Sequence, residues 1–294
     1  MYVTLCHINK ARKDYYWHCR CRGVNKYLQL FRIGNCVMGI VGLLMGLWVA
    51  AGVEIVDSAW PITFGAGVVF LFIAAGNSLN DYIDREVDKQ GHPERPIPSG
   101  KMTPRTVLQV SAVCFAASLA LSLFLNWHSI VVVVTAILLM LTYELRTKKA
   151  GFSGNLTIAA LTAMLFLLGG TMVDALDRTY VLAILAGLAT LGREVIKDIE
   201  DMEADFDRNT LPKRIGVRNA GIVGGAAIVG AVLLSPLPYL ESNFGLQYLA
   251  AVSVADAIFI YAAVVQLRSP KLGQRYAKYG MLVALVAFLL GGFQ

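Results

Sequence analysis

The stretch NSLNDYIDREVD, residues 77–88, decides the fold of this chain, because it sets a group of acids against the end of a long apolar run at 61–83. A second stretch, REVIKDIEDMEAD at residues 193–205, repeats this arrangement after the apolar run at 179–197. A carboxylate costs about 2.5–3.5 kcal/mol at the centre of a bilayer, so acids placed against membrane helices usually serve a function. The two stretches predict membrane helices that end in a polar site.

Composition supports the same class of fold. The chain has 294 residues, of which 56% are hydrophobic and 16% charged, and its mean hydropathy is +0.59. Apolar runs long enough to cross about 30 Å of hydrocarbon recur along it. They do not alternate as strands would. We expect an all-α integral membrane protein of nine transmembrane helices, at 29–53, 61–83, 106–126, 129–146, 155–174, 179–197, 219–238, 246–267 and 277–293, in a single domain over residues 28–294.

The positive charge follows a topological pattern. Net charge is +6, and the lysines and arginines gather at 1–32, 85–105, 146–149, 193–218 and 268–278. With nine helices and a cytoplasmic N-terminus, all these segments face the cytoplasm, and Arg178 is the exception. Basicity therefore indicates a multi-pass protein of the cell membrane and not a nucleic-acid partner. Residues 1–27 lack the apolar core of a cleavable signal peptide, so we expect a basic segment on the inner membrane surface.

The spacing of the acids predicts a metal site on the cytoplasmic side. On a helix, Asn80, Asp84 and Asp88 form one stripe, and so do Asp198, Asp201 and Asp205. Magnesium prefers such oxygen ligands and binds diphosphate oxygens at the same time. We expect Asn80, Asp84, Asp88, Asp201 and Asp205 to bind Mg²⁺, with Asp81 and Asp198 as ligands or supporting groups.

A diphosphate also needs cationic contacts, because lysine and arginine donate charge-assisted hydrogen bonds to phosphate oxygens. Candidates on the same face are Arg95, Arg146, Lys148, Arg193 and Lys197. Two alternatives remain open. The acids could simply pair with Arg85, Lys89, Arg193 and Lys197 at a solvated membrane edge. The chain could also be a cation transporter, although transporters place their acids near the midplane on broken helices.

These motifs together resemble the UbiA-type intramembrane prenyltransferase superfamily. The resemblance rests on Asn80-Asp81-x-x-Asp84-x-x-x-Asp88, the loop RPIPSG at 95–100 and Asp201-x-x-x-Asp205. It implies a bundle of nine helices around a central cavity, closed by loops on the cytoplasmic side, with Mg²⁺ between the two acidic motifs. The implied catalytic residues are Asp84, Asp88, Asp201, Asp205 and Lys148. Family members commonly carry Tyr-x-x-x-Lys after the fourth helix, whereas here Lys148 comes five residues after Tyr143.

Within the superfamily, the chain is similar to the digeranylgeranylglyceryl phosphate synthases, through Arg32-x-x-Asn35-Cys36, the pattern at 193–205 and the stretch LSPLPYL at 234–240. That similarity implies transfer from geranylgeranyl diphosphate to the free hydroxyl of geranylgeranylglyceryl phosphate, a lipid-like acceptor. Aromatic quinone-type and porphyrin-like acceptors are the alternatives. Asp81 and Asp198 are candidates for the base that takes the hydroxyl proton. The expected substrate contacts are Asn35, Asn80, Asp81, Arg95, Tyr143, Arg146, Arg193, Lys197 and Asp198.

Overall fold

The computed structural model describes residues 25–57, 59–202, 209–241 and 244–293, and within these ranges it contains helices and turns but no strand. The predicted all-α class is confirmed. The long helices are α2 (Ile33–Ala51), α3 (Ala59–Ile83), α5 (Pro104–Ser122), α6 (Trp127–Leu145), α7 (Phe152–Met172), α8 (Leu176–Glu200), α10 (Val217–Leu234), α12 (Leu246–Val265) and α13 (Pro270–Gly291). The short ones are α1 (Lys26–Phe31), α4 (Arg85–Gly91), α9 (Leu211–Ile215) and α11 (Leu237–Leu240), with 3-10 turns at Gly52–Asp57 and Thr147–Lys149.

Eight of these helices are long and apolar enough to cross a membrane, counted over the part of the chain that the structure describes. The ninth predicted span, now α13, falls outside that group although it has 22 residues. Lys271, Arg275 and Lys278 occupy its first half and lower its hydropathy. It nevertheless packs against α12 and α8 within the bundle. The predicted count of nine is therefore one higher than length and composition support.

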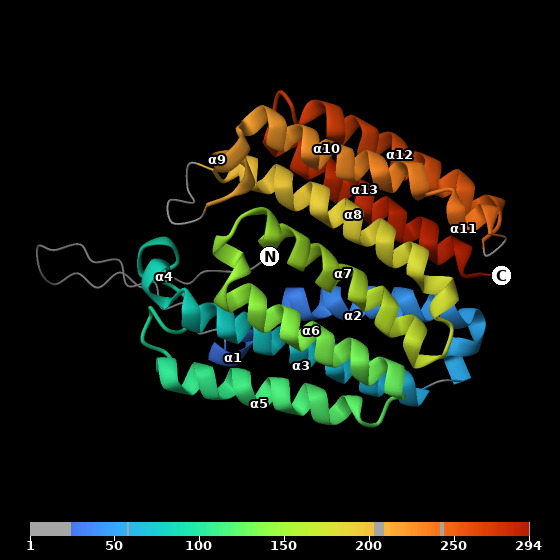
Figure 1. Ribbon diagram of the computed structural model, residues 1–294. Helices are drawn as coiled ribbons and strands as arrows, with labels where there is room; N and C mark the ends of the chain where they lie inside the picture. Colours follow the sequence, from blue (N-terminus) through green and yellow to red (C-terminus); the bar gives the residue numbers. More distant parts are fainter. Residues whose placement is uncertain (1–24, 58, 203–208, 242–243, 294) are drawn as a thin grey trace, which may run out of the picture.

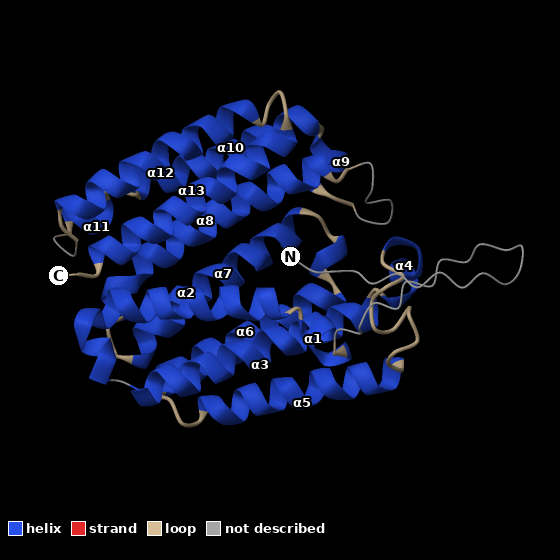
Figure 2. Cartoon of the chain, turned by 180° about the vertical axis from the view of Figure 1, so that it is seen from behind, coloured by secondary structure: helices blue, strands red, loops and turns tan. Residues whose placement is uncertain are grey.

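The helices lie in two groups side by side, α2, α3, α5, α6 and α7 in one and α8, α10, α12 and α13 in the other (Figure 1). Successive long helices run in opposite directions, so α4 and α9 lie at one end of the bundle and α11 and the C-terminus at the other, as the reverse view also shows (Figure 2). We call the end that carries α4 and α9 the motif end. The described residues that end the two acidic stretches, from α3 and from α8, lie there.

Glycines allow the helix backbones to approach closely, as is common in membrane bundles. A Cβ atom added to Gly169 of α7 would lie 2.5 Å from the Leu47 nitrogen of α2. One added to Gly192 of α8 would lie 2.7 Å from the Gly224 carbonyl oxygen of α10. These two contacts leave no room for a larger residue, and they fix how α2 meets α7 and how α8 meets α10.

Two predicted helices are interrupted at residues that matter for the site. The span predicted over 29–53 breaks at Arg32, whose φ of 49° and ψ of 65° are left-handed and end α1 before α2 begins. The predicted stripe of Asn80, Asp84 and Asp88 does not lie on one regular helix. α3 ends at Ile83, and Asp84, with φ −83° and ψ 4°, caps α4. Hydrogen bonds from Asp84 N to Asn80 O and from Asp88 N to Asp84 O, each 2.9 Å, hold the bend together.

The second acidic stretch also departs from the expected regular helix. α8 ends at Glu200, and Asp201 is its C-cap, with its backbone N–H donating to the Lys197 carbonyl. Asp205 lies outside the described residues, as do residues 1–24 of the predicted N-terminal segment. Asp198 and Asp201 are both partly buried at the motif end.

Candidate functional site

Three acids of the first stretch are each paired with a cation from outside that stretch. Arg32 Nη2 lies 2.5 Å from Asp81 Oδ1. Arg95 Nη1 lies 2.5 Å from Asp88 Oδ2. Lys148 Nζ lies 2.6 Å from Asp84 Oδ2. The alternative in which these acids simply pair with neighbouring cations does not describe them, because Lys89 binds Glu86 and Arg85 donates to the Tyr82 carbonyl.

Local structure fixes two of these cations. The left-handed turn at Arg32 lets its guanidinium also donate to Asn80 Oδ1 at 3.0 Å. Arg95 is held by its own loop, in which Ser99 Oγ donates to the Arg95 carbonyl at 2.6 Å and Gly100 supplies a φ of 71°. Gln29 Nε2 of α1 donates to the Glu94 carbonyl at 2.8 Å and anchors that loop. The RPIPSG loop therefore positions Arg95 over the end of α3.

Lys148 is held by an acid that the sequence patterns did not identify. Glu144, one helical turn earlier, accepts from Lys148 Nζ at 3.1 Å and from Asn80 Nδ2 at 3.2 Å. Both side chains are buried, with exposed fractions of 4% for Lys148 and 3% for Glu144. The residue at the four-residue spacing from Lys148 is Glu144, and Tyr143 lies partly buried beside it. An i, i+4 acid–lysine pair is the signal that could have found Glu144.

The predicted residues of the second stretch occupy a different setting. Asp198 Oδ2 accepts from Asn155 Nδ2 of α7 at 2.8 Å. Arg193 forms an ion pair with its neighbour Glu194. Lys197 is partly buried on α8, and Arg146 is exposed at the C-cap of α6. Asn155 is a second residue that the sequence patterns did not identify.

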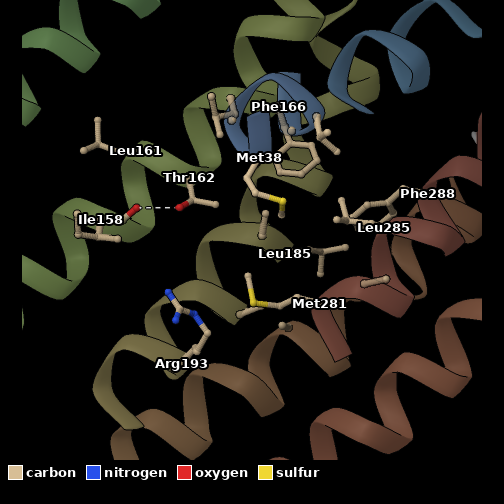
Figure 3. A pocket seen from close by; sticks show the side chains of 18 of the residues that line it. Met38, Ile158, Leu161, Thr162, Phe166, Leu185, Arg193, Met281, Leu285 and Phe288 are labelled. Atoms are coloured by element: carbon tan, nitrogen blue, oxygen red, sulfur yellow. Dashed lines mark hydrogen bonds between the residues drawn. The ribbon is translucent and has the colours of Figure 1, made fainter. Parts of the chain in front are cut away.

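A cavity of about 510 Å³ runs between the two groups of helices. Its walls are almost entirely apolar, with Met38, Leu161, Phe166 and Met281 among them, and Figure 3 shows them facing one open space. Asn35 and Arg193 line it toward the motif end. Such a size and polarity suit a small-molecule site that holds an apolar chain. The predicted central cavity is confirmed.

The donor chemistry of the site fits magnesium. Carboxylate and amide oxygens are what Mg²⁺ takes from proteins, and Asn80, Asp84 and Asp88 supply them at the bend between α3 and α4. No group of three or more histidine, cysteine or acidic side chains is arranged to hold a metal within the described ranges. The carboxylates Asp81, Asp88 and Asp84 are instead balanced by Arg32, Arg95 and Lys148 respectively.

Comparisons with known proteins find relatives over nearly the whole chain. The model of the UbiA prenyltransferase family matches residues 39–289. Digeranylgeranylglyceryl phosphate synthase of Methanosarcina mazei is 36% identical, with 92% of this chain and 99% of the relative covered. The synthase of Thermococcus kodakarensis is also 36% identical, over 90% of this chain and 96% of the relative.

Solved structures give the same result. A structure described as digeranylgeranylglyceryl phosphate synthase in membranes superimposes with a TM-score of 0.80 at 32% identity, covering 91% of this chain and 98% of that one. A UbiA homologue from Archaeoglobus fulgidus, bound to DMAPP and Mg²⁺, shares the fold at a TM-score of 0.67 and 15% identity, over 88% of this chain and 99% of that one. The chain therefore belongs to the UbiA prenyltransferase family.

Proposed function

We propose that this enzyme transfers a geranylgeranyl group from geranylgeranyl diphosphate to the free hydroxyl of geranylgeranylglyceryl phosphate, with Mg²⁺ as cofactor. Membership of the family makes the chain a membrane-embedded prenyltransferase. The observation that carries the choice of substrates is the similarity, over about nine-tenths of the chain, to synthases of digeranylgeranylglyceryl phosphate. The ether bond formed would be the second one of an archaeal-type lipid precursor.

In this proposal the diphosphate binds at the motif end. Lys148, Arg95 and Arg32 exchange their carboxylate partners for phosphate oxygens and donate charge-assisted hydrogen bonds to them. Glu144 keeps the Lys148 ammonium directed toward this position. The residues that would hold Mg²⁺ are Asn80, Asp84, Asp88, Asp198, Asp201 and Asp205. When bound, the metal would neutralise charge on the diphosphate leaving group.

The apolar cavity then accounts for the transfer step. The bond between C1 and the bridging oxygen breaks, and the diphosphate leaves with the electron pair. The acceptor hydroxyl oxygen forms the new bond to C1 and loses its proton, for which Asp81 and Asp198 are the candidate acceptors. Walls such as Met38, Leu161 and Phe166 keep water away from the allylic cation.

The acceptor phosphate needs cations of its own. Arg193 lines the cavity, and Lys197 lies one helical turn further along α8 toward the motif end. We assign these two residues to the glycerol phosphate, together with Arg146 at the end of α6. Asn35 and Tyr143 complete the proposed substrate contacts. We further propose that the motif end faces the cytoplasm, because lysines and arginines concentrate in the segments there.

Purified protein incubated with labelled geranylgeranyl diphosphate and Mg²⁺ tests the proposal. Geranylgeranylglyceryl phosphate and 4-hydroxybenzoate are offered in parallel, and the labelled products are separated. We expect an ether product with the first acceptor and none with the second. Efficient prenylation of 4-hydroxybenzoate, with no product from the glycerol phosphate, would show that the acceptor is aromatic.

A further inference from the structure

Asp256 is an acid inside the membrane part of the bundle that the transfer step does not use. It is the eleventh of the 20 residues of α12, so it lies near the middle of that span. Its side chain lines the cavity, far along the chain from both acidic stretches. An ionisable residue at such a depth is costly and usually indicates a function.

One neighbour fixes the Asp256 carboxylate. Ser235, which directly follows α10 and is buried, donates from Oγ to Asp256 Oδ2 at 2.6 Å. Ser235 also lines the cavity. Its own carbonyl accepts from the hydroxyl of the fully buried Tyr248 at 2.7 Å. The carboxylate is therefore held in the cavity wall and cannot turn away from it without losing this hydrogen bond.

The pair lies deep in the cavity, away from the motif end. Leu185 precedes Arg193 by eight residues, which is about 12 Å along α8. Leu185 packs in one cluster with Ala231 and Val252, which lie one turn before Ser235 and Asp256 respectively.

Aromatic rings pack together beyond the pair, on the side away from the motif end. The Phe166 and Phe288 ring centroids are 6.2 Å apart, and Phe288 stacks on Tyr248 at 6.1 Å. Figure 3 shows Phe166 and Phe288 across the cavity from Arg193.

We propose that the Ser235–Asp256 pair is a polar stop that sets the longest prenyl chain the cavity accepts, an inference that rests on the proposed function. Between the motif end and the pair the cavity walls are almost entirely apolar, and each methylene added to the prenyl chain gains contact with them. At the level of Asp256, a hydrocarbon would strip water from the carboxylate and offer no hydrogen bond in return. A chain that ends short of the pair is unaffected, whereas a longer one is rejected.

Diphosphates of two, three, four and five isoprene units, offered to the wild type and to Asp256→Leu, test this limit. In the wild type we expect kcat/KM to rise up to four units and to fall at five. Asp256→Leu should raise the five-to-four ratio of kcat/KM by about tenfold, which corresponds to about 1.4 kcal/mol. The two-unit donor should react as before. A purely structural role for Asp256 would instead lower kcat/KM for all donors together.

A second variant tests the same level without changing the acid. Gly280 of α13 packs against Phe259, so Ala284, one turn further, lies near Asp256 and also lines the cavity. Ala284→Leu should fill that space and lower kcat/KM for the four-unit donor relative to kcat/KM for the two-unit donor. Ser253→Leu is the matched control, because Ser253 is an exposed polar residue of α12 that bonds its own helix at the Leu249 carbonyl.

The outcomes separate the two proposals. A wild type that transfers none of the four donors refutes the proposed function and this inference with it. An active wild type whose donor ratios stay unchanged in both Asp256→Leu and Ala284→Leu refutes the polar stop alone. If Asp256→Leu fails to fold, Ala284→Leu decides, because it leaves the Ser235–Asp256 hydrogen bond in place.

Discussion

The two acidic stretches hold similar positions at the ends of α3 and α8, yet their surroundings differ. In the first, Asp81, Asp84 and Asp88 are each bound to an arginine or lysine from elsewhere in the chain. In the second, Asp198 accepts from an uncharged amide, Asn155, and Asp201 caps its helix. The first stretch thus holds three cations that we propose bind phosphate, whereas in the second stretch Asp198 contacts an amide.

This difference suggests how the work is divided. The cationic nitrogens lie 2.5–2.6 Å from carboxylate oxygens of the first stretch, so their positions are fixed. In our proposal a diphosphate binds to cations that are already in position. The second stretch lies on the helix that carries Arg193 and Lys197, which we assign to the acceptor. The first stretch would therefore bind chiefly the donor, while α8 would bring metal ligands and the acceptor site together.

Removing a proposed metal ligand from either stretch should have the largest effect. Asp84→Ala and Asp201→Ala should each lower kcat by about 10²–10³-fold, the loss typical of removing one group that stabilises charge in the transition state. Asp88→Ala and Asp205→Ala should lower kcat by a similar factor. A chelator should abolish turnover until Mg²⁺ is restored. Initial rates with labelled donor provide the measurement.

Equal losses in both stretches would place them on one shared metal site. If Asp84→Ala lost activity while Asp201→Ala and Asp205→Ala kept normal rates, the second stretch would have no role in metal binding. Normal rates in all of these variants would remove the metal site from consideration. Combined variants should lose little more than single ones, because groups that act as a unit are not additive.

Lys148 should come next in the size of its effect. Lys148→Gln removes a buried charge that we place on the leaving group, so kcat should fall by about 100-fold. Glu144→Gln keeps the shape of its partner and should cost less, with a rise in donor KM as the sign that Lys148 is less well positioned. Lys149→Gln, at the exposed neighbouring residue, is the matched control. A Lys149→Gln loss as large as that of Lys148→Gln would contradict a specific role for the buried lysine.

Arg193 distinguishes the acceptor from the donor. A charge-assisted contact contributes about 1.5–3 kcal/mol, or roughly 10–100-fold in affinity. Arg193→Gln and Lys197→Gln should therefore raise the acceptor KM by that factor and leave the donor KM within about twofold. Arg95→Gln should do the reverse, because Arg95 pairs with Asp88 of the first stretch. Steady-state kinetics with each substrate varied in turn measures both constants. An equal rise in the acceptor KM and the donor KM for Arg193→Gln would mean that Arg193 contacts the donor diphosphate as well.

Hydrophobic runs predicted most of the fold, because a membrane helix is specified by a long apolar stretch of sequence. The stripe of Asn80, Asp84 and Asp88 was placed at the correct end of the correct helix. The sequence did not predict the bend that divides this stripe, since no proline or glycine lies within residues 77–84 to indicate it. The break at Arg32 could not be predicted either, because no sequence pattern marks an arginine whose backbone is in the left-handed region.

The pairs within the site depend on tertiary structure. Arg32 lies 49 residues before Asp81, and Lys148 lies 64 residues after Asp84, so spacing along one helix cannot link them. Arg95 and Lys148 were identified as cations of the site, but their individual partners were not. Asp256 was overlooked because it stands alone, with no second acid at helical spacing. Single polar residues in apolar runs become informative only when the fold shows which face lines the cavity.

The smallest effect is expected at an ion pair of the first stretch that lies outside the site. Lys89 Nζ lies 2.6 Å from Glu86 Oε2, but both side chains are mostly exposed, at 58% and 68%. The hydrogen bond from the Lys89 ammonium lowers the pKa of Glu86 from its usual value. The pair's contribution to stability is therefore present above the usual Glu pKa and is lost as pH falls through the lowered one. Water and salt screen such an exposed ion pair, so its contribution to the stability of the protein is small.

Lys89→Gln should accordingly leave kcat within about twofold, and should leave the unfolding temperature in detergent within about 1 °C of the wild type. Arg95→Gln, only six residues away, is the contrasting variant. It strands the buried carboxylate of Asp88, and stranding a buried charge is strongly destabilising. Its unfolding temperature should fall by several degrees. Parallel thermal melts of the two variants at the same salt concentration make the comparison. Equal melts would mean that Asp88 is as well solvated as Glu86, and the first stretch would then be no more tightly held than an ordinary charged helix end.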